Sequence, residues 1–457
     1  MSSLPELDGL DVPPSREEIQ QTMDTLEEHN VSLVHLQFSD IAGGGRTVTI
    51  PASLLPKVFK RGFRFDGSAI SGGLRQVEVD LFLVPDPGTL VVLPSTEGQP
   101  RKAQLFCWVT RKGGQPFAGD PRTILQRQLQ RAASLGLDYR VGIELEFYLY
   151  KGESLAEAVR ENIDGGLGYF SDGSVGTSVV RDQIVASMQE LGLGVHGAHH
   201  ETGPGQQELD LRHQGGIRIA DQLSITRQLI RVIAREYGMN VTFMAKPFGD
   251  APGSGMHLFQ RMLNLDDSTD MLRDEGSNEI NAMAGHMIAG QIAHAPAMSA
   301  VLNTTVNSYK RLSDGHRAPA WATWARVSEA SLLRIPGIPR GTAMEIELRS
   351  PDAMANPYLA VAVALGAAVS GIEQQLDPPE PFDENLVHYH EEEYARLGVE
   401  RLPQTLGAAI DILAQDETMR EILGDYIVDQ LVTVKRGEWD EFRRHVSPWE
   451  HAKYGGL

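Results

Sequence analysis

The segment 142–149, GIELEFYL, places two carboxylates two residues apart inside an apolar, β-prone run. Side chains alternate along a strand, so Glu144 and Glu146 are predicted to share one face. On a one-sided antiparallel strand such a pattern is usually a solvated face. Here Ile143, Leu145 and Phe147 would form the buried face, and the two glutamates would line a cleft. Crowded carboxylates beside apolar residues need a proton, an arginine or a metal ion nearby.

Four further candidates for the same site follow in the chain. Glu201 and Glu208 flank a Gly-Pro-Gly turn, His257 follows a glycine-rich loop, and Glu347 lies in another alternating run. Oxygen-rich ligand sets suit Mg²⁺ or Mn²⁺ better than zinc, and one histidine among several glutamates is compatible with both ions. The sequence therefore predicts a Mg²⁺ or Mn²⁺ site.

Length and composition exclude several classes of protein. A chain of 457 residues is long enough for two domains, or for one large domain with an appendage. Acidic residues outnumber basic ones by 61 to 41, which makes nucleic acid an unfavourable partner. The single Cys107 forms no internal disulfide, and neither a signal peptide nor a membrane-spanning stretch is expected. The pattern predicts a cytoplasmic protein that binds no membrane.

The predicted elements divide the chain into two parts. A helix over 15–30 and short strands over 31–38, 46–50, 89–93 and 103–109 make a small α+β unit. Residues 112–116 resemble a linker, and Asp120-Pro121 begins a helix that continues to 133. Long helices and carboxylate-bearing strands follow, with helices predicted over 180–191, 217–237, 278–293, 356–374 and 406–416.

Several ordered motifs together resemble the glutamine synthetase superfamily of bacterial type. The resemblance covers about residue 30 to the C-terminus. The motifs are Phe65-Asp66-Gly67-Ser68, Glu144-x-Glu146, His200-Glu201 through Glu208, Lys246-Pro247, Gly253-Ser254-Gly255-Met256-His257, Asn307 to Arg311, Arg334-Ile335-Pro336, Glu347 to Asp352 with Asn356-Pro357-Tyr358, and Ser447 to Glu450.

The resemblance implies a fold and an assembly. The expected fold is α+β, with an N-terminal β-grasp domain over 15–115 and a catalytic domain over 116–457 whose antiparallel strands form a bifunnel. Family members form rings with active sites between subunits, so self-association is expected, with a dodecamer as the predicted size.

The resemblance also implies roles for individual residues. Glu146, Glu201 and Glu208 would hold the metal ion that meets the substrate's γ-carboxylate. Glu144, His257 and Glu347 would hold a second ion on the phosphates of ATP. Arg311 would bind the substrate's α-carboxylate, Arg349 would contact the transferred phosphate and the nucleotide, and Arg334 would bind the nucleotide phosphates. Gly253 would contact the substrate through its backbone. Asp66, Tyr169 and Glu201 would form the ammonium pocket.

The implied chemistry is the ATP-dependent activation of a carboxylate. ATP would phosphorylate the γ-carboxylate of L-glutamate, and an amine would displace the phosphate. Metal ions and arginines would neutralise the charge on the moving phosphoryl group.

The sequence departs from the family pattern on the side of the amine. The serine of the ammonium pocket is replaced by Ala69, and the flap signature Gly-Tyr-Glu-Ala-Pro reads Gly-His-Arg-Ala-Pro over 315–319. The flap glutamate, a catalytic residue in the family, is therefore Arg317. A cation about 4 Å from an incoming ammonium ion would oppose it by roughly 4 kcal/mol at an effective dielectric constant near 20.

Other departures affect the phosphate and nucleotide contacts. Glu329 and Glu345 stand where the family has arginines, and Arg317 with Glu329 suggests a reciprocal exchange of charge. Independent drift of the two positions is the alternative to that exchange. The loop asparagine and the second histidine of the glycine-rich motif are replaced by Pro252 and Phe259. Val387 replaces the tyrosine that is adenylylated in some members.

Together these observations predict a ligase that joins L-glutamate to a primary amine other than ammonia. An ordinary glutamine synthetase with altered flap chemistry is one alternative. A non-catalytic homologue with a regulatory role is another, although all six predicted metal ligands are present.

Overall fold

A computed structural model gives the fold of the chain. The structure describes residues 14–70, 80–94, 98–158, 163–164, 168–171, 176–274, 276–277, 279–313, 318–337, 341–383 and 391–456. The two expected positions Arg317 and Val387 therefore lie outside the described residues.

The N-terminal part begins with a capped helix. Helix α1 (Arg16–Glu28) starts after Ser15, whose hydroxyl accepts a hydrogen bond from the Glu18 backbone N–H. The Glu18 carboxylate in turn accepts from the Ser15 backbone N–H at 2.8 Å. This reciprocal capping box satisfies two backbone donors that the first helical turn would otherwise leave unpaired. The predicted helix over 15–30 is confirmed.

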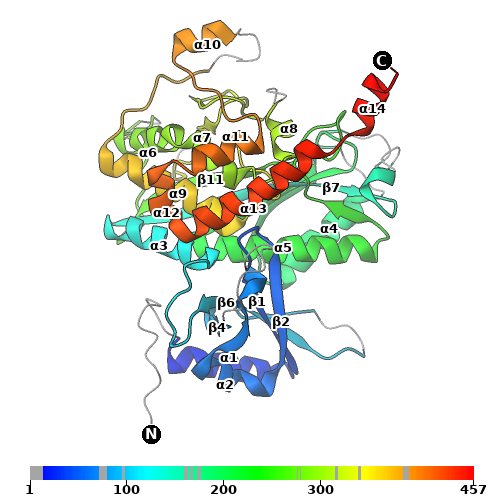
Figure 1. Ribbon diagram of the computed structural model, residues 1–457. Coiled ribbons are helices and arrows are strands. Elements are labelled where there is room, and N and C mark those ends of the chain that lie inside the picture. Colours follow the sequence, from blue (N-terminus) through cyan, green and yellow to red (C-terminus); the bar gives the residue numbers. More distant parts are fainter. Residues whose placement is uncertain are drawn as a thin grey trace.

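A mixed sheet of six strands packs against α1 and α2 (Leu55–Arg61), as Figure 1 shows at the blue end of the chain. The order is β2-β1-β6-β4-β3, with β5 beside β6. Its strands are β1 (Leu33–Ser39), β2 (Gly45–Pro51), β3 (Phe63–Asp66), β4 (Asp80–Pro85), β5 (Val91–Val92) and β6 (Lys102–Thr110). The expected β-grasp domain is confirmed, with its own apolar core.

The larger part is built on an eight-stranded sheet. The order is β12-β13-β14-β11-β7-β9-β8, and β10 pairs with β7. The described pairs are antiparallel except β12 with β13, so the sheet is mixed rather than wholly antiparallel. Its strands are β7 (Leu137–Tyr150), β8 (Val195–His200), β9 (Gln206–Gly215), β10 (Asn240–Thr242), β11 (Met256–Asn264), β12 (Trp324–Ala325), β13 (Leu333–Arg334) and β14 (Ile346–Leu348).

Helices surround this sheet, and α10 and α14 project from the body of the molecule (Figure 1). The helices are α3 (Pro121–Ser134), α4 (Thr177–Glu190), α5 (Gly216–Glu236), α6 (Ala282–Ala293), α7 (Ala295–Leu302), α8 (Ser308–Leu312), α9 (Pro357–Gln374), α10 (Glu391–Leu397), α11 (Leu406–Leu413), α12 (Glu417–Leu423), α13 (Asp425–Arg444) and α14 (Pro448–Tyr454).

Two predicted helix boundaries were wrong because of caps. Helix α6 starts at 282 rather than 278, since the Asn281 side chain accepts from the Ala284 backbone N–H. The helix expected over 406–416 ends at Leu413, because Asp416 is already the N-cap of α12. Short polar side chains that bond the backbone end one helix and start the next.

Helix α9 is the central helix of the larger part. It is long and apolar enough to cross a membrane, which the sequence analysis did not anticipate, but 83% of that segment is buried inside the protein. It packs closely against α6 through glycines. A Cβ on Gly371 would lie 2.1 Å from the His286 carbonyl oxygen, so the helices could not approach this closely with a larger residue.

One buried arginine joins the two parts of the chain. Arg122, near the start of α3, donates to Asp86 of the β-grasp part at 2.7 Å and to Asp221 of α5 at 2.8 Å. Its guanidinium group also stacks 3.9 Å from the ring centroid of Trp108. A buried cation with two anionic partners fixes the catalytic part against the β-grasp part.

We predict that Gly371→Ala destabilises the fold by about 1–3 kcal/mol, because the added methyl group overpacks the crossing of α6 and α9. Gly437→Ala on α13 is the matched control, since no described atom beyond the local backbone of its own helix lies within 4 Å of the point that a Cβ would occupy there. That change should stabilise the chain by up to about 1 kcal/mol through helix propensity alone. Denaturant unfolding of both variants measures the difference, and equal effects would contradict this account of the crossing.

Candidate metal centre and active-site cavity

Four adjacent strands bring the predicted ligands onto one face of the larger sheet. Glu144 on β7 lies opposite His257 on β11 and opposite Asp210 on β9, and Glu146 lies opposite Glu208. Directly opposite residues of antiparallel strands point to the same face. Along β7, the three apolar residues between and around the glutamates are at most 1% exposed. The strand therefore buries one face and turns its carboxylates toward a cavity.

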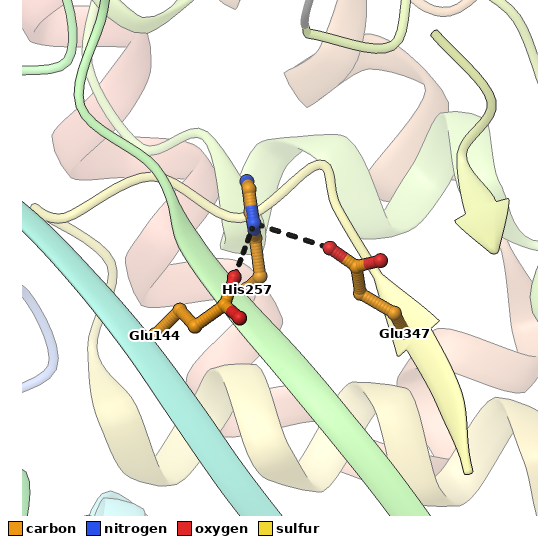
Figure 2. A group of neighbouring side chains, drawn as sticks. All are labelled: Glu144, His257 and Glu347. Carbon is orange, nitrogen blue, oxygen red and sulfur yellow. Dashed lines mark hydrogen bonds and ion pairs between the residues drawn. The ribbon is translucent and has the colours of Figure 1, made fainter. Parts of the chain in front are cut away.

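His257 lies between two carboxylates, as Figure 2 shows. Its Nδ1 is 3.2 Å from Glu144 Oε2 and 3.3 Å from Glu347 Oε1. Its Nε2 is 3.9 Å from Glu146 Oε1. Burial opposes a charged imidazole, but hydrogen bonds to Glu144 and Glu347 outweigh it and raise the pKa of His257 to about 9. One histidine ring thus contacts three carboxylates of the predicted set.

Glu347 is fully buried and surrounded by cations. Arg334 Nε donates to its Oε2 at 2.5 Å, and Arg349 pairs with its Oε1. Burial would raise the pKa of this carboxyl, but the contact with His257 and the charge of Arg349 lower it to about 2. Glu347 therefore stays ionised with its charge already balanced.

A second group of carboxylates is balanced less completely, because contact with His199 leaves the pKa values of its carboxyls raised. Single ligand atoms of Glu144, Glu208 and Asp210 lie within 4.8 Å of one another, as do those of Glu144, His257 and Glu347. Burial and the neighbouring carboxylates together raise the pKa of Glu208 to about 7, against the opposing effect of the hydrogen bond with His199. Burial and Glu144 raise the pKa of Asp210 to about 6. These groups resist ionisation unless a cation lies among them.

The structure places the other predicted metal ligands less tightly. Glu201 lines the same cavity, but its carboxylate accepts from the backbone of Thr202 and belongs to neither compact group. Glu146 is held by Gly255 N–H at 3.0 Å and by Gln206 Nε2 at 3.2 Å. The roles of both as metal ligands stay predictions.

Sequence reasoning missed two residues of this site. Asp210 follows Glu208 by two positions, so Glu-x-Asp repeats on β9 the spacing of Glu-x-Glu on β7. His199 Nε2 lies 3.1 Å from Glu208 Oε1, and its pKa rises to about 9 because the contact with Glu208 outweighs burial. The two-residue spacing was the available signal for Asp210; the pairing of His199 required the register between β8 and β9.

The carboxylates open into a cavity of about 990 Å³. Its walls include the predicted substrate and phosphate residues Tyr169, Gly253, Arg311, Arg334 and Arg349. Buried Arg311 donates to the carbonyl oxygens of Ser350 at 2.8 Å and Arg349 at 3.0 Å, which fixes its position in the wall. The cavity combines carboxylates with arginines in its lining, as expected of a site for anionic substrates and a divalent ion.

Asp66 and Ala69 do not line this cavity within one chain. Asp66 ends β3 and accepts from the Ser68 backbone N–H at 2.9 Å, while Ala69 lies in the short helix η2 (Gly67–Ile70) of the β-grasp part. Their predicted place beside the amine therefore requires a second copy of the chain.

The substituted charges have new partners. Arg334 Nη1 lies 3.8 Å from Glu329 Oε1, and Arg349 Nε donates to the Glu329 carbonyl oxygen at 3.0 Å. Glu345 pairs with Arg261 at 2.8 Å. Arg317 lies outside the described residues, so the suggested exchange between Arg317 and Glu329 stays a prediction.

Comparisons with known proteins identify the family. Residues 30–112 match the glutamine synthetase β-grasp domain, and residues 118–454 match the glutamine synthetase catalytic domain. Glutamine synthetase of Staphylococcus epidermidis is 37% identical over 430 residues, covering 94% of this chain and 96% of that protein. Glutamine synthetase of Staphylococcus aureus is 37% identical over 436 residues, with the same coverage.

Two solved structures are similar over nearly their whole length. A complex of GmaS with ADP has a TM-score of 0.86 and 28% identity, covering 95% of this chain and 99% of that one. Apo GmaS has a TM-score of 0.83 and 27% identity, with the same coverage. The family models, the relatives and the fold are those of an ATP-dependent ligase. The chain belongs to the glutamine synthetase family, whose members use ATP and divalent metal ions.

We predict that Mn²⁺ affinity rises between pH 6 and pH 8. His257 and Glu208, with pKa values of about 9 and 7, carry protons that must leave before a metal ion binds. The increase should reach up to about tenfold per pH unit for each proton released. Calorimetric titration at several pH values measures how steeply the Mn²⁺ affinity changes with pH. Glu208→Gln should remove the part of that pH dependence that comes from the Glu208 proton. An affinity that is the same at both pH values would contradict this description of the centre.

Proposed function

We propose that the chain joins the γ-carboxylate of L-glutamate to a primary amine other than ammonia, with Mg²⁺ or Mn²⁺ and ATP. The observation that carries the proposal is the cavity in which carboxylates of four strands face Arg311, Arg334 and Arg349. Such a site can hold a divalent ion beside a phosphate group and bind a second anion.

The first step is phosphoryl transfer. An oxygen of the γ-carboxylate attacks the terminal phosphorus of ATP, and the bond to ADP breaks. Arg349 and Arg334 lie where they can neutralise charge on the moving group, since both already contact Glu347. Arg311 would bind the α-carboxylate of glutamate through its remaining donor positions. A bound divalent ion would supply the rest of the neutralising charge.

The second step is attack by the amine. Its nitrogen attacks the acyl carbon, phosphate leaves with the electron pair of the broken bond, and the amine gives up a proton. Glu201 lines the cavity and is our candidate acceptor for that proton. A carboxylate near the nitrogen favours binding of the amine in its protonated form. Because only the neutral amine can attack, that proton must leave before the new bond forms.

Aromatic rings support an amine with an apolar substituent. The rings of Tyr169 and Phe170 have centroids 4.3 Å apart, and the Phe170 ring lies 4.4 Å from that of His199. All three residues line the cavity. Aromatic faces attract an alkylammonium ion and also pack against its carbon atoms. GmaS, a γ-glutamylmethylamide synthetase, is similar in structure over 95% of this chain, which agrees with a primary amine as the substrate.

Ammonia is the second candidate nucleophile. The relatives named glutamine synthetase are 37% identical, closer in sequence than the 28% identity to GmaS. Ala69 and Arg317 favour the larger amine, because they remove a polar group and add a cation in motifs of the ammonium pocket.

We also propose a ring assembly, with a dodecamer as the expected size. Asp66 and Ala69 would reach the amine end of the cavity only from a neighbouring subunit. The C-terminal segment of α13 and α14 carries exposed apolar side chains, Val446, Trp449 and Tyr454, each at least 55% exposed within one chain. Contiguous exposed apolar surface commonly marks an interface. A cytoplasmic location stays a prediction from the sequence.

At least one alkyl, hydroxyalkyl or aryl amine should exceed ammonia in kcat/KM at neutral pH. The measurement is ADP release with ATP, Mg²⁺, glutamate and a panel of amines, with the γ-glutamyl product identified by mass. Ammonia as the best substrate of a broad panel would leave ordinary glutamine synthetase activity as the function. Absence of ADP release with every amine would support the non-catalytic alternative.

Glu146→Gln should lower turnover by about a hundredfold or more, the size typical of removing one electrostatic stabiliser of a transition state. Glu236→Gln, at the exposed end of α5, is the matched control and should keep full activity. Size-exclusion chromatography checks that both variants keep the wild-type assembly. Full turnover of Glu146→Gln, or of the wild type in EDTA, would refute the proposed metal-dependent mechanism.

A further inference from the structure

A second cavity of about 470 Å³ adjoins the carboxylate cluster. It shares Glu144, His196 and Asp210 with the main cavity, so the two cavities meet at these residues. The walls away from the cluster are Gly142, Leu211, Arg212, His213, Phe259, Arg261 and Glu345. A Cβ on Gly142 would lie 2.9 Å from His213 Cε1, so the glycine leaves room for the His213 ring in its present position.

Glu345 extends from the cluster into this second cavity. It precedes Glu347 by two residues, so at extended spacing it lies about 7 Å further along the chain. Its partner Arg261 follows His257 by four residues on the same face of β11, and Phe259, which lines the same cavity, follows His257 by two. The second cavity is thus lined by residues that lie further along the chain from His257 and Glu347, the candidate metal ligands of these two segments.

Only one oxygen of the Glu345 carboxylate is occupied. Arg261 contacts Oε2 through Nη2 at 2.8 Å and Nε at 3.0 Å, and His213 Nε2 lies 3.1 Å from the same oxygen. Within the described part of the chain, Oε1 accepts no hydrogen bond. Two neighbouring side chains thus fix Glu345 through one oxygen, and its other oxygen is left as an acceptor in a residue that lines the cavity.

We propose that Glu345 Oε1 accepts a hydrogen bond from a ribose hydroxyl of ATP. The inference rests on the proposed use of ATP with its phosphates at the metal centre. Glutamate and the amine then occupy the main cavity, so the nucleoside must extend into the second one. A carboxylate that bonds ribose hydroxyls is a general solution in nucleotide sites. The separation of about 7 Å from Glu347 suits the ribose next to the phosphates better than the far edge of the base.

Phe259 supports the same assignment. Its ring lines the second cavity beside Arg261. A flat apolar wall next to a charged acceptor suits a nucleoside, which presents an apolar face and a hydroxylated edge. Arg261, two strand positions from Phe259, places a cation beside the same wall and holds Glu345 in position.

The test compares ATP with 2′-deoxy-ATP and 3′-deoxy-ATP on the full chain with Mg²⁺. Dissociation constants come from calorimetry, and kcat/KM comes from ADP release where turnover occurs. The wild type should prefer ATP over at least one deoxynucleotide by about ten- to a hundredfold, the value of a hydrogen bond to a charged group. Glu345→Gln should reduce this preference by about tenfold, and Glu345→Ala should abolish it.

Comparing ratios separates recognition from structure. A purely structural ion pair between Glu345 and Arg261 would weaken all three nucleotides alike and leave the preference unchanged, which overturns the proposal. Equal binding of all three nucleotides to the wild type also overturns it. Glu373→Gln, which removes a partly exposed ion pair with Arg131 outside both cavities, is the control and should keep the wild-type preference.

The outcome is independent of the amine. A chain that binds ATP with the expected ribose preference but releases no ADP with any amine refutes the proposed function and supports the ribose contact. A chain that turns over amines but does not distinguish ATP from either deoxynucleotide refutes the ribose contact alone.

Discussion

Repulsion among carboxylates on one sheet face is the constraint on which the site depends. Glu144, Glu146, Glu208 and Asp210 are held within adjacent strands whose register leaves them no freedom to separate. On the side of Glu347, two arginines and His257 balance the charge. On the side of Glu208 and Asp210 the balance is only partial, because His199 contacts Glu208 and yet the pKa values of both carboxyls are raised. A divalent ion is the group that would complete it.

The rest of the structure serves to hold this unfavourable cluster. The long strand β7 contributes two glutamates while its opposite face packs into the main core, and α9 fills that core from the other side. Because the strands are fixed, the carboxylates cannot move apart to reduce their repulsion. They therefore stay at positions where a single cation can contact several of them. The two cavities meet at the cluster, and in our proposal glutamate and the amine bind in one of them and the nucleoside of ATP in the other. This arrangement is what a carboxylate-activating ligase requires.

The sequence predicted most of the elements and most of the carboxylates that the structure gathers around the cavity, because alternation in β7 and the caps at Ser15 and Asp120 are local signals. It did not predict which charges pair. The contact of Glu345 with Arg261 and that of Glu329 with Arg334 depend on strand register and loop position, which no local pattern encodes. Asp210 was missed although its spacing from Glu208 repeated the signal that had identified Glu146.

Anomalous diffraction at the manganese edge tests the central claim most directly. Crystals grown with Mn²⁺ and ADP should show one peak bounded by Glu144, His257 and Glu347 and another on the side of Glu208. Occupancy should be lost in crystals of Glu208→Gln at the second position only. Anomalous density absent from both positions, with Mn²⁺ bound elsewhere or not at all, would contradict the view that this carboxylate cluster is a metal centre.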